Sequence, residues 1–412
     1  MTDYLNDYCM HDHTCGQLRA SDVDSQVTLT GWVWHNRDHG GLIFVDLRDR
    51  EGYTQVVIDP DCVSAEDFAV AEHLGREYVV EIVGKVRARA EGTVNPNMAT
   101  GEIEVLATSV KVLNTSVTPP FSIEDGIETD ETTRMKWRYM DLRRPEMFNA
   151  IKLRHTVAQA MRSALNDRGF IEVETPILAN STPEGARDYI VPSRPNPGKF
   201  YALPQSPQQF KQMLMCGGIE RYYQIARCFR DEDLRADRQP EFTQIDLEMS
   251  FITEEDIMTL VENYLAGLFK EIKGVEVKTP FLRMTWDEAM NKYGIDKPDM
   301  RIPLEMVPLE EVFAGGENPF AALVAGGGTI KGLRLPGGAA LSRKELSDLE
   351  GRAKALGAKG MANFQVKEGE LKGPLVKFLD EGRIAKLKEL SGIENGDALF
   401  IMADESWRRA CE

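Results

Sequence analysis

The sequence lacks every sign of a membrane or secreted protein. No apolar run reaches the roughly eighteen residues that span a bilayer. The first seven residues are acidic and polar, without the basic start and apolar centre of a secretory signal. The six cysteines have no framework spacing, which indicates reduced thiols. These absences argue against membrane contact and predict a cytoplasmic protein.

Positive charge is also scarce, because the net charge is −17. A protein this acidic does not coat nucleic acid indiscriminately. Two local basic clusters nevertheless lie beside aromatic-bearing strands, and together they favour a polyphosphate partner. Their members are Lys85, Arg87 and Arg89 in the first cluster, and Arg134, Lys136, Arg138, Arg143 and Arg144 in the second.

Residues that bind metals are few, and one short cluster of them near the N-terminus is a candidate metal site. Cys9, His11, His13 and Cys15 are residue types that bind zinc, and they alternate along the chain. Strict alternation would place all four on one side of an extended strand, where tetrahedral closure is awkward. We therefore expect no metal site here, and a frayed N-terminal tail.

Residues 1–113 predict an oligonucleotide-binding (OB) fold, a small β-barrel. Five apolar-alternating runs and one helical segment lie between turns, as in that barrel. The runs are Val27–Trp34, Leu42–Leu47, Thr54–Ile58, Tyr78–Val86 and Ile103–Val112, and the helical segment is Ser64–Leu74. Barrels of this type stack single-stranded bases on aromatic side chains. Phe44 is the natural platform, with Arg37 and Gln55 as polar readers, although Phe44 by itself fits core packing equally well.

A proline-containing, acidic linker is predicted at 114–133, followed by an α+β core at 134–287. An amphipathic helix over 151–168 precedes Gly169, which suits a helix end, and a strand over 170–175 stops before Pro176.

Two strands, near 222–229 and 242–251, flank a loop with three arginines and five carboxylates. Such a loop suits a pocket that grips and orients a polyanion. Residues 288–412 are Gly- and Lys-rich and predict a separate small α/β unit. Its glycine run at 326–328 lacks phosphate-loop spacing and is expected to be a turn.

Several motifs in order resemble bacterial aspartyl-tRNA synthetases, a family of class II aminoacyl-tRNA synthetases. The barrel resembles their anticodon-binding domain, and residues 169–176 resemble motif 1, the dimer element. Phe229-Arg230-Asp231-Glu232 resembles motif 2. Residues 182–188 resemble the mobile loop over the amino-acid pocket, 205–211 the aspartate-binding segment, and 293–299 the entry to the bacterial insertion domain.

The resemblance implies an ATP- and Mg²⁺-dependent ligase, a homodimer, that joins L-aspartate to tRNA(Asp). It implies that Arg230 is catalytic and contacts both substrates. The aspartate-binding set would be Glu184, Ser206, Gln208, Lys211, Arg230 and Asp246; the ATP-binding set Arg230, Asp231, Glu232 and Gln239; and the anticodon contacts Arg37, Phe44, Gln55 and Glu102.

The chain departs from the family pattern in two ways. Motif 3, with its ATP-binding arginine, is absent before residue 412, so we expect a C-terminally truncated fragment with an incomplete core and insertion domain, unable to form aspartyl-adenylate alone. His39 and Gly92 replace the leucine and lysine that tRNA(Asp)-specific relatives tend to carry, which favours a non-discriminating enzyme that also charges tRNA(Asn).

Alternatives stay open at this stage. A strictly tRNA(Asp)-specific enzyme is one, and a non-catalytic RNA-binding fragment is another. The asparaginyl and lysyl enzymes share the barrel and motifs 1 and 2, but would not be expected to show the insertion. The amphipathic helix at 151–168 could pack within one subunit rather than form a dimer.

Overall fold

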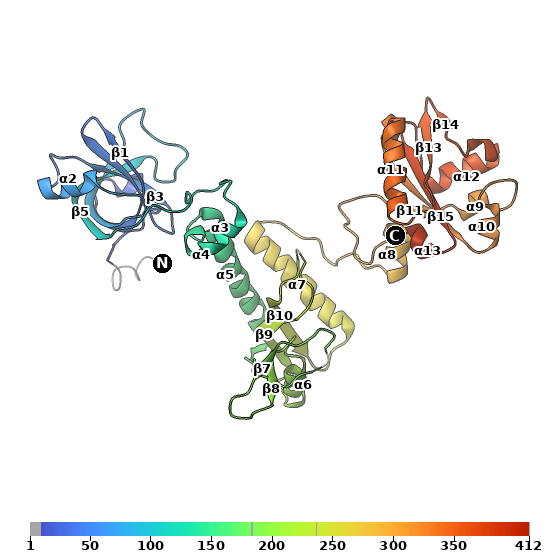
Figure 1. Ribbon diagram of the computed structural model, residues 1–412, viewed down its shortest axis with the longest axis horizontal. Helices are drawn as coiled ribbons and strands as arrows, with labels where there is room; N and C mark the ends of the chain where they lie inside the picture. The colour runs from blue at the N-terminus through green and yellow to red at the C-terminus, as the bar shows by residue number, and fades with distance from the viewer. Residues whose placement is uncertain (1–9, 183, 236, 412) are drawn as a thin grey trace. The chain divides into compact units, whose positions relative to one another are not determined.

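The computed structural model describes residues 10–182, 184–235 and 237–411, and it separates into two compact units, 1–279 and 280–412 (Figure 1). The division falls shortly before residue 288, where the sequence placed the start of the last domain. Each unit has its own hydrophobic core. Among the described helices, none is long and apolar enough to cross a membrane.

The first unit begins with a closed five-stranded barrel in the order β1-β2-β3-β5-β4 (Figure 1). Its elements are η1 Ala20–Asp22, β1 Gln26–His39, β2 Leu42–Arg48, β3 Tyr53–Ile58, α2 Ala65–Glu72, β4 Val79–Ala88 and β5 Ile103–Asn114. Alternate residues of each strand point inward, so that Val27, Leu29 and Val33 of β1 are fully buried. The predicted OB-fold is confirmed.

The residues just before the barrel are ordered against it. The Asp12 backbone N–H donates to the Thr28 carbonyl oxygen at 3.2 Å, and the Thr28 N–H donates to Asp12 Oδ1 at 2.8 Å. Cys15 is fully buried in the barrel core. The expectation of a frayed tail is therefore wrong for residues 10–15, because apolar burial holds them; Cys9 lies outside the described residues. In the described part of the chain, no three His, Cys, Asp or Glu side chains gather as metal ligands.

A short helical hinge connects the barrel to the core. It consists of α3 Glu131–Lys136 and α4 Arg138–Asp141, and the preceding linker packs Phe121 and Ile123 against Met140. Helix α5, Pro145–Asn166, starts earlier than predicted because Pro145 suits the first helical turn. Gly169, at φ +78°, follows its end as expected.

The core sheet has the order β10-β9-β6, with β9 and β10 antiparallel and β6 parallel to β9. The remaining core elements are β6 Ile171–Glu172, β7 Ile190–Pro192, β8 Phe200–Ala202, α6 Gln208–Cys216, β9 Arg221–Phe229, β10 Glu241–Met249 and α7 Glu254–Lys273. Strand β6 is shorter than the predicted 170–175 because the chain leaves the sheet before Pro176, which cannot donate to a ladder.

The two faces of the β9–β10 hairpin have different environments. On one face Tyr223, Ile245 and Leu247 pack against Leu165 of α5 and Leu260 of α7. The opposite face carries polar side chains, because strand residues alternate between faces. This division places the polar residues of the hairpin on the side away from the hydrophobic core.

The second unit is a five-stranded sheet in the order β11-β12-β15-β13-β14 with helices around it (Figure 1). Its elements are α8 Trp286–Tyr293, β11 Met306–Pro308, α9 Glu310–Phe313, α10 Ala321–Ala325, β12 Thr329–Leu335, η2 Gly338–Ala340, α11 Arg343–Ala355, β13 Ala362–Lys367, β14 Glu370–Lys372, η3 Val376–Phe378, α12 Glu381–Ser391, β15 Ala398–Asp404 and α13 Trp407–Cys411. The glycine run at 326–328 forms a turn between α10 and β12, as predicted.

Candidate active site and nucleic-acid interface

Helix α6 brings a lysine onto the polar face of the β9–β10 hairpin. Lys211 Nζ lies 3.0 Å from Asp246 Oδ1 and 3.4 Å from Glu248 Oε2. Burial raises the pKa of Asp246, and Lys211 opposes that shift. The other oxygen, Asp246 Oδ2, is buried and accepts no hydrogen bond from the residues described. A buried carboxylate with an unused acceptor suits a cationic ligand group.

The Cys228 thiol lies among four of the predicted site residues. Burial, together with the nearby Asp246 and Glu184, raises its pKa to about 11, although Arg230 and Lys211 act in the opposite direction. These four charged residues come from α6, β10 and two separate loops. All four influence the pKa of one thiol, and Lys211 and Asp246 are in direct contact.

The loop at 182–188 is tied to the segment before α6. Ser206 Oγ donates to Glu184 Oε2 at 2.7 Å. Gln205 Nε2 donates to the Ala186 carbonyl oxygen at 2.8 Å and to Asp188 Oδ1 at 2.6 Å. Glu184 and Ser206 are thus in contact as expected of one site, whereas Gln208 begins α6 as an exposed side chain. Pro183, part of the same predicted motif, lies outside the described residues.

Arg230 lies where the polar loop leaves β9. Its backbone N–H donates to the Pro240 carbonyl oxygen at 2.9 Å, and its guanidinium carbon lies 5.1 Å from the centre of the Phe242 ring. A cavity of about 870 Å³ here is lined by Arg230, Glu232 and Gln239. The remaining charged or polar lining side chains are Arg154, Arg227, Asp233, Asp237, Arg238, Glu241 and Thr243.

Asp231 lies apart from that cavity lining. Its backbone N–H donates to the Arg187 carbonyl oxygen at 3.0 Å, and its carboxylate lies 3.8 Å from Arg187 Nε. The structure therefore joins the mobile-loop motif directly to the motif 2 loop. The neighbouring Ala236 is not among the described residues.

Sequence reasoning missed three polar residues of this hairpin face. Tyr222 Oη and Thr175 Oγ1 both donate to Gln224 Oε1, at 2.9 and 2.8 Å. Cys228 Sγ donates to Gln244 Oε1 at 2.9 Å. Burial and, second, the nearby Asp246 raise the pKa of Tyr222. Period-two alternation along the two predicted strands was the signal that could have placed Tyr222, Gln224 and Gln244 on the same face as Asp246.

The predicted anticodon readers lie on the outer face of the barrel. Arg37 pairs in register with Phe44, and Arg37 Nη2 donates to both oxygens of Asp46 at 3.0 and 2.9 Å. Gln55 Nε2 donates to Glu104 Oε2 at 2.9 Å. Phe44 is half-buried, so part of its ring reaches solvent. An aromatic ring beside a guanidinium and an amide is a chemically suitable surface for stacked bases.

The other three predicted anticodon positions are exposed. His39 ends β1 and Glu102 precedes β5. Gly92 has φ +84°, and no neighbouring atom lies within 4 Å of the point where a Cβ would stand. These positions therefore lie at strand ends and in a loop.

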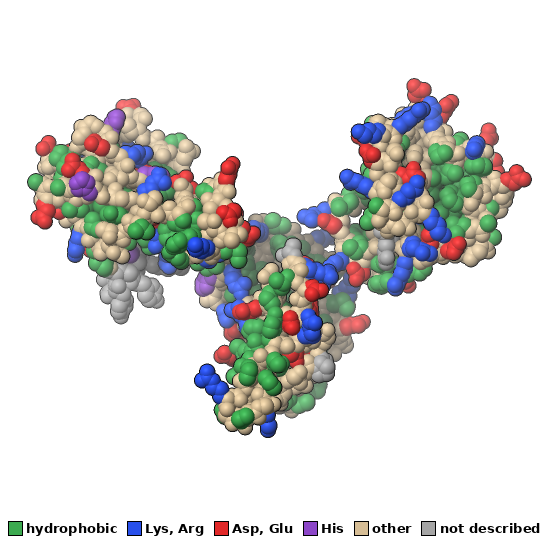
Figure 2. Space-filling model, viewed as in Figure 1, with side chains coloured by type: hydrophobic (Ala, Val, Ile, Leu, Met, Phe, Trp, Pro, Cys, Tyr) green, Lys and Arg blue, Asp and Glu red, His purple; other side chains and the backbone are tan. Residues whose placement is uncertain are grey.

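Several arginines of the two predicted basic clusters pair with acids of the same chain. Arg143 donates to Glu77 at 2.7 Å, and Arg144 is buried beside Asp141 at 3.1 Å. Arg87 Nε lies 2.8 Å from Glu104 Oε1. On the side of the barrel seen in Figure 2, acidic, basic and apolar side chains are interspersed. These arginines serve internal ion pairs: Glu77 and Glu104 are distant in sequence from Arg143 and Arg87, whereas Asp141 lies three residues before Arg144.

Comparison with known proteins agrees with this architecture. Residues 27–113 match the family described as OB-fold nucleic acid binding domain, and residues 130–401 match that described as tRNA synthetases class II (D, K and N). A solved asparaginyl-tRNA synthetase from Pyrococcus horikoshii, complexed with asparaginyl-adenylate, superposes with a TM-score of 0.57 over 95% of this chain and 92% of that chain. At 20% sequence identity this likeness shows the fold alone.

The fold and the matched families define a class II aminoacyl-tRNA synthetase architecture. The chain belongs to the class II tRNA synthetase family of the D, K and N group. It is 55% identical to the aspartate–tRNA(Asp/Asn) ligase of Bacillus subtilis over 95% of the chain and 66% of that protein. It is 52% identical to that of Syntrophotalea carbinolica over 98% of the chain and 68% of that protein. The chain thus spans about two thirds of the length of these relatives.

Proposed function

We propose that the protein carrying this chain is an aspartate–tRNA ligase that charges tRNA(Asp) and also tRNA(Asn). One observation carries the proposal: Arg230 lines the cavity of about 870 Å³ at the end of the hairpin whose polar face holds Lys211 in contact with Asp246. A guanidinium in that position can contact two ligands at once. The tRNA(Asp/Asn) specificity is supported by the names of relatives that are 52–55% identical.

In the first step, an α-carboxylate oxygen of aspartate bonds to the α-phosphorus of ATP, and the bond from that phosphorus to the oxygen of the leaving pyrophosphate breaks. Both reactants are anionic, so the protein must neutralise and align them. Arg230 would contact the α-phosphate and the α-carboxylate. Glu232 and Gln239 would hold the adenosine part, with Asp231 close by through its contact with Arg187.

Lys211 would pair with the side-chain carboxylate of the substrate, which explains the choice of amino acid by charge. Asp246 Oδ2, which is buried, and Glu184 would accept from the substrate ammonium; Ser206 and Gln208 complete this set. In the second step, a terminal ribose hydroxyl of tRNA attacks the aspartyl carbonyl carbon and AMP leaves.

Mg²⁺ is expected to enter with the triphosphate and to offset its charge. No described group of three His, Cys, Asp or Glu residues forms a ready metal site, which fits an ion held chiefly by phosphate oxygens. Glu232, Asp233, Asp237 and Glu241 line the cavity and could supply a carboxylate oxygen to such an ion.

The remaining parts of the proposal concern partners. The anticodon would stack on Phe44, with Arg37, Gln55 and Glu102 reading its edges. A homodimer is supported by apolar side chains that α5 leaves exposed, Ile151 at 53% and Leu153 at 40%. A cytoplasmic location stays a prediction from the sequence.

The test uses the protein at the full length that its gene encodes. Arg230→Ala should lower aspartate-dependent ATP–pyrophosphate exchange by about 10²–10³-fold, the usual loss when one transition-state donor is removed. Arg352→Ala, an exposed arginine of α11, is the matched control and should leave the rate unchanged. Undiminished exchange in Arg230→Ala would refute the proposed role.

A further inference from the structure

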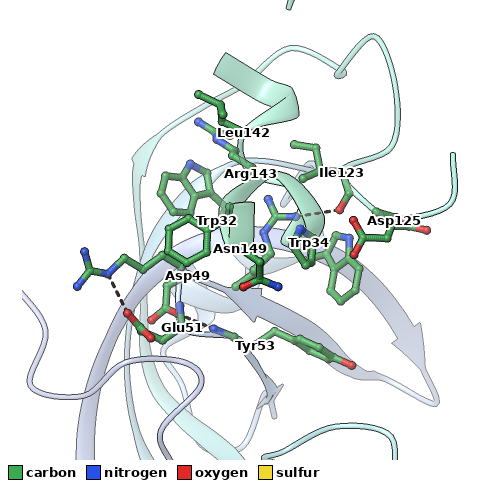
Figure 3. A pocket seen from close by; sticks show the side chains of 16 residues that line it. Trp32, Trp34, Asp49, Glu51, Tyr53, Ile123, Asp125, Leu142, Arg143 and Asn149 are labelled. Carbon is green, nitrogen blue, oxygen red and sulfur yellow. Dashed lines mark hydrogen bonds and ion pairs between the residues drawn. The ribbon is translucent and has the colours of Figure 1, made fainter. Parts of the chain in front are cut away.

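A second cavity lies between the barrel and the hinge, and its lining includes none of the residues assigned to the two sites above. Its volume is about 630 Å³ (Figure 3). Trp32 and Trp34 of β1 stand on opposite sides of it, and Tyr53 of β3 closes another side. Ile123 and Leu142 contribute apolar surface from the linker and hinge. Its size and aromatic lining fall within the range of small-molecule sites.

The aromatic walls are held in fixed positions. Trp34 meets Tyr53 edge to face, with ring centres 4.8 Å apart. The Arg143 guanidinium lies over Trp32 at 4.6 Å, and Arg48 lies 5.9 Å from the Trp34 ring. Glu77 holds both of these guanidinium groups, at 2.8 Å from Arg48 and 2.7 Å from Arg143. The cavity is therefore formed before any ligand arrives, which lowers the cost of binding.

Two polar features define what the cavity can recognise. The Trp34 indole nitrogen is buried and has no acceptor within the described part of the chain, although buried indole N–H groups usually have one. Glu51, Glu124 and Asp125 also line the cavity and offer carboxylate acceptors. Arg48, which is buried, and Arg143, which is partly exposed, are already paired with Glu77, so the remaining lining charge is mainly negative.

We propose that this cavity binds a free nucleoside whose base carries an exocyclic amino group. The planar base would lie between the two indole walls, where stacking is favourable for any base. Its amino group would donate to a carboxylate of the lining, and its ring nitrogen or carbonyl would accept from Trp34. A phosphate would meet those carboxylates and be disfavoured. Binding of this nucleoside does not depend on the proposed ligase activity.

The test follows the five tryptophan indole N–H resonances of the ¹⁵N-labelled chain by NMR. Trp34→Phe identifies the Trp34 resonance by its disappearance. Cytidine should shift that resonance saturably. Uridine, which replaces the amino group with a carbonyl, should bind about fivefold more weakly, because it loses the contribution of one net hydrogen bond. Pyrimidine probes also avoid an adenosine site elsewhere in the protein.

A second variant keeps the test valid if Trp34→Phe perturbs folding. Asn149→Phe fills the cavity from α5 and should abolish the shift, whereas His155→Phe, exposed on the same helix outside the lining, should preserve it. The proposal is overturned if cytidine up to about 10 mM leaves Trp34 unmoved, if uridine binds as well as cytidine, or if Asn149→Phe binds normally. Cytidine monophosphate binding more tightly than cytidine would overturn the free-nucleoside source and indicate a base supplied by a nucleotide or nucleic acid.

Discussion

The first unit contains two sets of buried charges that differ in how completely they are paired. At the junction of barrel and hinge, Glu77 is shared by Arg48 and Arg143, and all their strong contacts are internal. On the hairpin, Asp246 has Lys211 on one oxygen and no described donor on the other. Complete pairing indicates a structural role, and incomplete pairing indicates a place for a ligand.

Glu77, the acid of the completely paired set, also has an unusual backbone conformation. Its φ of +62° is uncommon for a residue other than glycine. That backbone strain persists because surrounding contacts fix it: the Glu77 backbone N–H donates to the Val33 carbonyl oxygen at 2.7 Å, and both guanidinium groups hold the carboxylate.

The largest expected effect tests the paired set. Glu77→Gln removes the charge that two arginines share, and breaking such a buried pair costs about 3–5 kcal/mol. We expect a loss of that size in the free energy of unfolding, measured by urea denaturation. Glu51→Gln is the control, because its pair with Arg50 is exposed and should contribute less than about 1 kcal/mol. Equal losses in the two variants would break the comparison.

The next effect tests the incompletely paired set. Lys211→Met should lower aspartate affinity about 100-fold, because a charged hydrogen bond in a desolvated site is lost. Stability should also fall, because Asp246 loses its buried partner, but by less than in Glu77→Gln, where one carboxylate serves two guanidinium groups. Calorimetric titration with aspartate and urea denaturation measure the two quantities. A stability loss as large as that of Glu77→Gln would show that Lys211 is structural.

The contrast between the two sets also shows how far the sequence could predict the structure. The alternation of apolar and polar residues was enough to predict the barrel strands and the hairpin that carries Arg230. It failed for Arg143, because its partner Glu77 is 66 residues away and is brought close by tertiary packing that a charge cluster does not reveal. The pair of Arg144 with Asp141, three residues earlier, is local and lay within reach of the sequence. A cluster of basic residues has the same sequence pattern whether its side chains pair with acids of the same chain or bind a ligand.

The site was predictable only in part for a similar physical reason. The resemblance named Lys211, Asp246, Glu184 and Arg230, which the fold brings around Cys228. No sequence pattern singled out Cys228, because the four charged residues reach it from separate segments of the chain. The cavity beside Trp34 depends on the hinge folding back on the barrel, a long-range contact that alternation along one strand cannot report.

A pH series compares two buried carboxylates whose pKa values are shifted in opposite directions. Burial raises the pKa of Asp246, whereas at Asp397 burial is outweighed by donors from Glu394, Gly337 and Arg334, which lower its pKa. Asp397 therefore contributes stability above its unfolded pKa that is lost as pH falls through its folded pKa. Asp246 carries a cost above its folded pKa that disappears as pH falls below its unfolded pKa.

The variants should show these signs directly. The destabilisation caused by Asp397→Asn should shrink as the pH is lowered from 7 towards about 3, since model Asp groups titrate near 4. The stability of Asp246→Asn relative to the unchanged chain should be highest near neutral pH and fall on acidification. Melting temperatures of both variants and the parent at each pH measure this. Parallel pH profiles would contradict the assigned shifts.

The smallest effects on stability are expected at two exposed barrel positions, His39 and Gly92. His39→Leu should change the free energy of unfolding by less than about 0.5 kcal/mol, because the side chain is exposed. Gly92→Lys should cost about 1 kcal/mol, because φ +84° is unfavourable for any residue with a side chain. If these two positions relax tRNA choice, both variants should weaken binding of tRNA(Asn) more than binding of tRNA(Asp).

That last comparison separates specificity from stability at the barrel surface. Fluorescence titration with each tRNA gives the ratio of affinities, and denaturation gives the stability of the same variants. His39→Leu is the cleaner probe, because it changes no backbone preference, so a shifted ratio would come from the anticodon contact itself. An unchanged ratio in both variants would leave His39 and Gly92 as ordinary loop residues and would remove the structural basis for tRNA(Asn) charging at this surface.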